Sequence, residues 1–208
     1  MRHLLLAAGI GLSGLAGAGA LPAQAAVVQG QSSAAAALDA LLVDYEAYLR
    51  QVDPIGSGMD GDRAALSRLP DASRAGELGR RAPLNALKAR LDAIDPAALD
   101  EAQRLNHAFV GYLIGRELER IELDPSRLAF DSEEGGPGQL LAYLAPAARI
   151  ATTADAEAWL TRLEAAPAYY DAGIANTRRG LETGLIQARS VVDSALAQAD
   201  MLIFVASE

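Results

Sequence analysis

The sequence predicts an all-α protein, an irregular bundle of six to seven helices that follows a cleaved signal peptide. Apolar residues recur at spacings of three and four along most of the chain, which is the period of one buried helix face. No stretch alternates apolar and polar residues for long enough to predict a strand. Gly, Pro and Asp gather between the periodic stretches, as they do at helix ends. These observations favour packed helices joined by turns.

The first 25 residues have the pattern of a secretory signal peptide. A polar start precedes an apolar run from Leu4 to Leu21, and the triplet Ala23-Gln24-Ala25 supplies the small residues that signal peptidase accepts. We expect cleavage between Ala25 and Ala26 and a periplasmic or extracellular mature protein. The alternative is a retained membrane anchor, which the five glycines of the apolar run disfavour.

The mature chain, residues 26–208, is expected to form a single helical domain. It has no Cys, so it can form no disulfide and has no thiol nucleophile. The net charge of −9 becomes −10 when Arg2 leaves with the signal peptide. An acidic surface repels nucleic-acid phosphates and anionic lipid headgroups. We therefore expect no nucleic-acid partner and no membrane association after cleavage.

The first predicted helix of the mature chain spans Ala34–Val52. Its buried face is Leu38, Leu41, Leu42, Tyr45, Leu49 and Val52. Asp53-Pro54 ends it, because the residue before a proline is pushed out of helical conformation. Pro54–Ala72 is predicted to be a loop, with one helical turn at Arg63–Arg68.

Two more helices are predicted in the middle of the chain. One runs from its cap at Ser73 to about Ile94, and Pro83 should kink or split it. Asp95 and Pro96 then form the start of a helix over Ala97–Leu123. The centre of that helix is hydrophobic nearly all round, so we expect it to be buried between several others.

The last third of the chain begins with an irregular stretch in which Gln139–Leu144 is expected to form a short helix. Thr152 and Asp155 have the spacing of a helix cap ahead of the next periodic stretch. A further helix opens at Pro167, and a final one begins near Arg189. The helix that opens at Pro167 should end at Gly184, with an inward face of Tyr170, Ile174, Thr177 and Leu181.

Candidate metal ligands are scarce. The mature chain has one His, His107, whereas a zinc site needs three or four ligands. The loop from Asp53 to Asp62 lacks the calcium-loop spacing and its terminal Glu. We therefore expect no metal site and no catalytic residue within this chain.

Two other arrangements have a catalytic and a structural interpretation. His107 could act as a general base, but no partner lies at a suggestive spacing, which favours a helix histidine hydrogen-bonded to a neighbour. Glu119 and Glu122 share a helix face and could flank a glycosidic bond. Arg116 and Arg120 are interleaved with them, which favours a solvated, salt-bridged face.

The most specific pattern lies between Thr152 and Asp193. It reads Thr-x-x-Asp-x-Glu-x-Trp-Leu-x-Arg-Leu, then Pro-x-Tyr, Ile-Ala-Asn-x-Arg-x-Gly, Gly-Leu and Arg-x-Val-Val. This order resembles the bacterial family called domain of unknown function 885. The first helix and the Leu84–Pro96 stretch also look similar to that family's opening, so the resemblance extends to about Asp200.

The resemblance implies an exported, mainly helical protein related to zinc metallopeptidases. The zinc-binding His-Glu-x-x-His helix of such proteins lies in a later half that has no counterpart here, so no metal or catalytic residue carries over. We expect an N-terminal portion that is inactive alone. The alternatives are a self-sufficient periplasmic helical binding or scaffold module and, least favoured, an enzyme complete in these residues.

The resemblance also implies a substrate-channel wall that includes Arg178 and Arg189, which match recurrent family positions. For these arginines the alternative is a salt bridge between adjacent helices. Tyr169 and Tyr170 are candidates for the same wall, and their alternative is core packing. A peptide substrate and a missing C-terminal half are the partners that this implies.

The final run, Met201–Glu208, is nearly all apolar. Polar residues are usual at a chain end, so we expect a fragment or an interrupted reading frame. An exposed apolar run promotes association, so we also expect self-association through the C-terminus.

Overall fold

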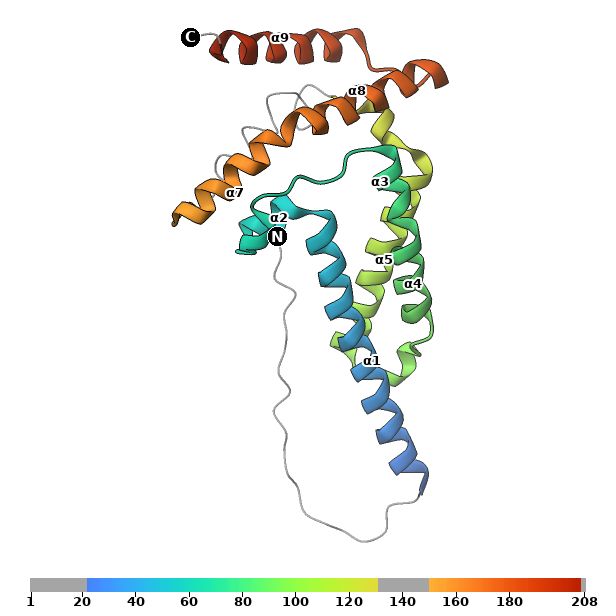
Figure 1. Cartoon of the computed structure of the whole chain (residues 1–208). Coiled ribbons are helices and arrows are strands. Elements are labelled where there is room, and N and C mark those ends of the chain that lie inside the picture. Colours follow the sequence, from blue (N-terminus) through green and yellow to red (C-terminus); the bar gives the residue numbers. More distant parts are fainter. Residues whose placement is uncertain (1–21, 131–149, 207–208) are drawn as a thin grey trace.

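The computed structural model describes residues 22–130 and 150–206 (Figure 1). Six α-helices of at least 12 residues, two of six residues and three 3-10 turns make up this part of the chain, and it contains no strand. The predicted all-α fold is confirmed. The first 21 residues, the expected helix at Gln139–Leu144 and the last two residues lie outside the described ranges.

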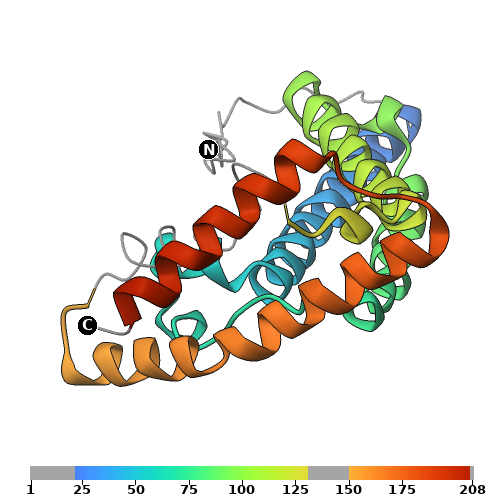
Figure 2. The same ribbon diagram turned by 90° about the horizontal axis from the view of Figure 1, so that it is seen from above.

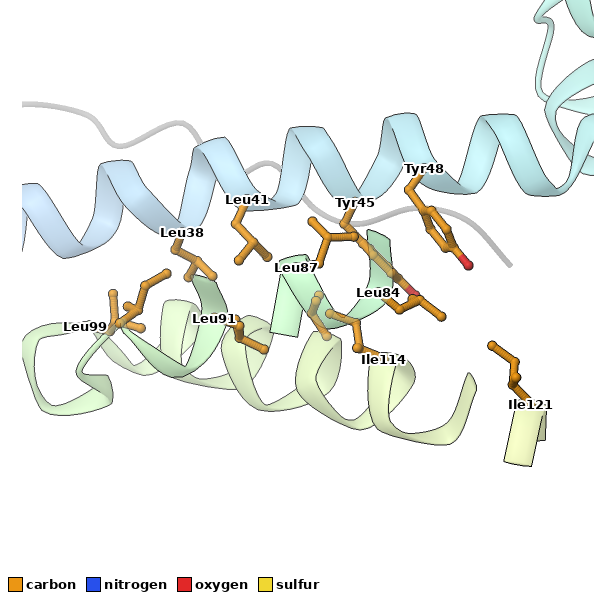
Figure 3. Close-up of a cluster of buried hydrophobic side chains, with 12 residues drawn as sticks. Leu38, Leu41, Tyr45, Tyr48, Leu84, Leu87, Leu91, Leu99, Ile114 and Ile121 are labelled. Atoms are coloured by element: carbon orange, nitrogen blue, oxygen red, sulfur yellow. The ribbon is translucent and has the colours of Figure 1, made fainter. Parts of the chain in front are cut away.

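Three helices form the apolar core. They are α1 (Pro22–Val52), α4 (Arg81–Asp92) and α5 (Glu101–Leu123). Figure 3 shows leucines of α1 and α4 facing one another above α5. The buried residues of this core are Leu38, Leu41, Tyr45, Tyr48, Leu84, Leu87, Leu91, Ile94, Leu99, Val110, Ile114 and Ile121. The helical spacing of the residues from α1, α4 and α5 explains why the sequence pattern located these helices correctly.

Helix α1 ends at Val52 as predicted but starts earlier than expected, at Pro22. It therefore includes the predicted cleavage site between Ala25 and Ala26. The next segment is the predicted loop only in part, because α2 (Pro54–Met59) follows at once. The Asp53 carboxylate accepts a hydrogen bond from the backbone N–H of Gly56, 2.9 Å away, and this cap holds a helix despite its glycines. The expected helical turn at Arg63–Arg68 is present as the 3-10 turn η1 (Arg63–Ala65).

The predicted helix from Ser73 to Ile94 is split, as Pro83 suggested, but the break falls at Arg80. Helix α3 (Arg74–Gly79) is capped by Ser73, whose hydroxyl accepts a hydrogen bond from Gly76 at 3.0 Å. Pro83 lies in the first turn of α4, where its missing N–H removes no intrahelical bond.

The start of α5 was predicted too early. Asp95 and Pro96 open only a 3-10 turn, η2 (Pro96–Ala98). Helix α5 begins at Glu101, after a capping box in which Asp100 and Gln103 each bond the other's backbone N–H.

The expectation that the centre of α5 is buried all round is wrong. Val110 and Ile114 are fully buried, whereas Leu105 is 70% exposed, Phe109 50% and Tyr112 62%. Helices α1 and α4 cover one face of α5 and no described element covers the other (Figure 1). A hydrophobic pattern shows which residues favour burial, but it cannot supply the neighbour that buries them.

Helices α7 (Thr153–Glu164) and α8 (Ala166–Thr183) form a nearly continuous arm across one end of the bundle (Figure 1). The predicted cap is confirmed, because Thr152 and Asp155 form a capping box. Helix α8 ends at Gly184, also as predicted, and the backbone there has the left-handed φ of 77° that favours glycine.

The predicted inward face of α8 is only half right, because Tyr170 and Thr177 are partly buried whereas the two aliphatic residues are exposed. Ile174 is 39% exposed and Leu181 is 67% exposed. The buried residues of α8 include Gly173, Asn176 and Gly180. A Cβ at Gly180 would lie 2.7 Å from the carbonyl oxygen of Arg127 in the 3-10 turn η3 (Pro125–Leu128), so α8 needs glycine to approach that backbone.

Helix α9 (Arg189–Ala206) begins where it was predicted and runs antiparallel to α8 (Figure 2). Val192, Leu196 and Met201 are exposed on it, and side chains beyond Met201 are not described. No helix in the described ranges is both long and apolar enough to cross a membrane.

The two faces of α5 make a matched test of this packing. Replacing the fully buried Ile114 with alanine should lower the free energy of unfolding by about 2–5 kcal/mol, because a cavity replaces packed side chain. Replacing the exposed Leu105 with alanine should change it by less than about 0.5 kcal/mol. Urea unfolding followed by circular dichroism measures both, and equal losses would show that α5 is covered on both faces.

Candidate functional site

The four predicted wall residues lie on α8 and α9. Tyr169 and Tyr170 are partly buried, and their rings meet edge to face with centroids 5.9 Å apart. Burial raises the pKa of both hydroxyls, so both are neutral at physiological pH. Arg178 is exposed, and Arg189 is 3.8 Å from Asp193 of its own helix. The structure thus pairs the tyrosines and leaves the two arginines on the surface.

The arginine that links adjacent elements is Arg179, next to the residue that the sequence indicated. Its Nη1 and Nη2 lie 3.0 and 3.2 Å from the two carboxylate oxygens of Asp124. Nη2 also donates to Asn176 Oδ1 at 2.9 Å. This fork-to-fork geometry is the strong form of an arginine–carboxylate pair.

Arg179 belongs to a larger group, which we call the charge cluster. Its members come from α3, α5, α8 and the residues around η3: Arg74, Glu77, Arg80, Glu117, Arg120, Asp124, Arg127 and Arg179. The cluster lies where α8 crosses the end of the core bundle.

Glu77 is the most buried acid of the cluster, at 4% exposed. Arg74 Nη1 donates to its Oε2 at 2.7 Å, and Arg120 Nη1 lies 3.1 Å from its Oε1. The Ser126 hydroxyl donates to Oε2 at 3.0 Å. A buried carboxylate needs such partners, because leaving water is costly for a charge.

Glu117 has two arginine neighbours. Burial by itself raises the pKa of this carboxyl, but the hydrogen bonds and charge of Arg120 and the charge of Arg80 outweigh burial and lower it. The same pairing raises the pKa of Arg120. Glu117 is therefore ionised at neutral pH and cannot serve as a general acid.

The cluster consequently acts as a clamp between elements. Its three carboxylates are each held by at least two arginines, so none is left to bind a metal or to abstract a proton. No local sequence pattern indicates this cluster, because its members are spread from residue 74 to residue 179.

His107 makes a hydrogen bond to a neighbour, as its structural interpretation predicted. Its Nε2 lies 3.0 Å from the carbonyl oxygen of Leu91. Because a carbonyl only accepts, Nε2 carries a proton and donates this hydrogen bond.

The other candidate acids are also engaged. Glu119 pairs with Arg116 at 3.2 Å on an exposed surface, and Glu122 pairs with Arg81. Asp53 and Asp62 accept helix-capping hydrogen bonds. Within the described ranges no group of three or more His, Asp or Glu residues could hold a metal ion.

Arg162 is a buried polar residue that sequence reasoning did not single out as functional. It is fully buried in α7, and its Nη2 donates to the carbonyl oxygens of Pro54 and Ala65 at 3.3 and 2.6 Å. A signal was present, because Arg162 lies three residues after the partly buried Trp159 and so shares its side of the helix. An arginine at such a position indicates a buried polar contact.

Most of the residues described above lie in a part of the chain that matches a known family. A family model described as "Bacterial protein of unknown function (DUF885)" matches residues 54–208. The chain belongs to this family. No curated protein and no solved structure matches it.

In this DUF885 protein the match differs from the expected extent at both ends. It begins at Pro54, so α1 lies before it, and it continues past Asp200 to Glu208. The charge cluster, Arg162 and the four predicted wall residues all lie inside the match.

The lowered pKa of Glu117 gives a pH test. The pKa of Glu117 is lower in the folded state than its unfolded value, which is near 4.5. Its ionised form therefore stabilises the fold at higher pH, and this contribution is lost as the pH falls through the lower, folded-state pKa. Arg120→Gln should remove part of that contribution, so the fall in stability below pH 4.5 should be shallower than in the wild type. Urea unfolding at a series of pH values measures the slope.

The control for this test is Arg116→Gln, because Arg116 pairs only with the exposed Glu119 in the described structure. Its acid slope should match that of the wild type. A wild-type slope in Arg120→Gln would show that Arg120 does not set the pKa of Glu117.

Proposed function

We propose that this DUF885 protein is an exported helical portion of a metallopeptidase-like protein of unknown substrate, inactive alone, whose zinc-binding part lies outside this sequence. Family membership supports the proposal. The main supporting observation is that the buried acids are already held by arginines or by helix-capping hydrogen bonds. Glu77 and Asp124 are committed to arginines, and Asp155 caps α7 and pairs with Arg63.

The role we propose for α8 and α9 is to form part of a wall around a peptide substrate. The paired rings of Tyr169 and Tyr170 offer an amphipathic surface, and Arg178 and Arg189 offer exposed positive charge to an acidic group of the peptide. No cofactor is needed for such a wall, and zinc would belong to the catalytic part.

A self-sufficient periplasmic binding or scaffold module is the second candidate. One observation favours it: α1, α4 and α5 bury a continuous apolar core by themselves. The DNA that follows the gene discriminates between the two. An open frame that encodes His-Glu-x-x-His supports the first candidate, and a terminator supports the second.

The main proposal is tested on protein exported by a bacterial host. The periplasmic product should begin at Ala26 by intact mass, and it should hydrolyse no peptide in a metal-dependent way, because its buried acids are already paired. A peptide library assay with and without chelator measures the activity. Chelator-sensitive hydrolysis by the pure chain would show a complete enzyme.

We propose further that the chain self-associates through its C-terminal helix. Val192 and Leu196 are one turn apart on α9 and both are exposed, and the apolar run that follows extends this surface along the sequence.

Leu196→Glu should shift the mass measured by light scattering toward that of a monomer, because a charge would enter the apolar contact. Ala197→Glu is the matched control, since it adds the same charge at an exposed position with little apolar surface. The idea fails if the wild type is a monomer at every concentration, or if both variants behave alike.

A further inference from the structure

Arg162 is the one described arginine that is fully buried without an acidic partner. It projects from α7 toward α2 and the 3-10 turn η1 (Arg63–Ala65). Only Nη2 has hydrogen-bond partners, the carbonyl oxygens of Pro54 and Ala65. Nε and Nη1 are buried and have no hydrogen-bond partner among the described residues.

The surroundings of Arg162 leave its positive charge still less compensated. Burial lowers the pKa of the Arg162 guanidinium, and the like charge of Arg68 lowers it further. Asp155 cannot compensate, because it pairs with Arg63 and accepts hydrogen bonds from the N–H groups of Ala151 and Thr152. An arginine nevertheless keeps its proton in proteins, so the charge itself remains.

Two donor nitrogens, which carry three N–H bonds, and one positive charge are therefore unmatched. Carbonyl oxygens and water can accept the hydrogen bonds, but neither carries the negative charge that a buried guanidinium requires. A small anion meets both needs together. A carboxylate suits a guanidinium best among monoanions, because its planar oxygens accept charge-assisted hydrogen bonds from planar N–H donors.

The packing limits the size of the ligand. A Cβ at Gly58 would lie 3.4 Å from Nη2 of Arg162 and 3.2 Å from Leu66, so this side of the guanidinium is already close-packed. The free nitrogens lie beneath the protein surface, with less than 1 Å² of each atom exposed. A ligand must enter through a local opening of the contacts between α7 and α2, which favours a compact carboxylate.

We propose that Nε and Nη1 of Arg162 form a binding site for a small monoanionic carboxylate, enclosed between α7, α2 and η1. The site does not depend on the proposed wall or on any peptidase activity. The carboxylate comes either as a small free acid or as the C-terminus of a peptide, and both sources present the same group to the guanidinium.

The test uses the whole mature chain with sodium formate as the probe and sodium chloride at equal ionic strength as the reference. Formate should raise the Tm of the wild type in a saturable way, by about 5–10 °C at 100 times its Kd. Arg116→Gln, which removes an exposed arginine that pairs with Glu119, should respond like the wild type. Arg162→Lys should lose the response, because lysine keeps the charge but has no Nε–H donor.

A second measurement keeps the test valid if Arg162 variants do not fold. In the wild type labelled with ¹⁵N-arginine, the Nε–H resonances of buried arginines are protected from exchange with water. Formate should shift one such resonance with the same apparent Kd as the thermal response, whereas chloride should not. Tri-alanine with a free or an amidated C-terminus then separates the two sources, since only the free acid should act if peptides are bound.

Three results would overturn the proposal. The first is a Tm response to formate that equals the response to chloride, which is charge screening alone. The second is a full formate response in folded Arg162→Lys. The third is a protected Nε–H spectrum that formate leaves unchanged, which would mean that water or a carboxylate of the chain already satisfies Arg162.

Discussion

The carboxylate of Asp124 holds the two parts of the described chain together. It accepts both arms of the Arg179 fork from α8, and Arg74 of α3 lies 3.5 Å away. Asp124 also ends α5 and starts η3 with a φ of 51°, a left-handed conformation that asparagine and aspartate tolerate better than most residues. Without this carboxylate, three arginines at the junction, Arg74, Arg127 and Arg179, would lose a counter-charge.

The core and this junction are stabilised by different physics. Leucines of α1, α4 and α5 pack through apolar contact, which has no preferred direction and tolerates small adjustments. Helix α8 instead docks through ion pairs and through glycines that let backbones approach closely. Because its polar and small residues face inward, apolar residues such as Ile174 and Leu181 remain exposed.

The distribution of charge separates the structural acids of the junction from the buried arginine of α7. At the junction, the acids Glu77, Glu117 and Asp124 are all neutralised by arginines, which makes them structural. Arg162 is the reverse case, a buried cation without an acid. Uncompensated charge is where a ligand gains the most, which is the basis of the carboxylate site that we propose at Arg162.

Local pattern by itself determined the fold class, several helix ends and the family of this protein. Ser73, Thr152 and Gly184 act within a few residues of themselves, so their roles could be read from the sequence. Tertiary structure decided which helix faces are covered and which charges meet. The exposed side of α5 and the inward glycines of α8 depend on neighbours far along the chain. Arg162 reaches backbone atoms about a hundred residues away, and no periodicity records such a contact, since burial is a property of the assembled neighbours rather than of a segment.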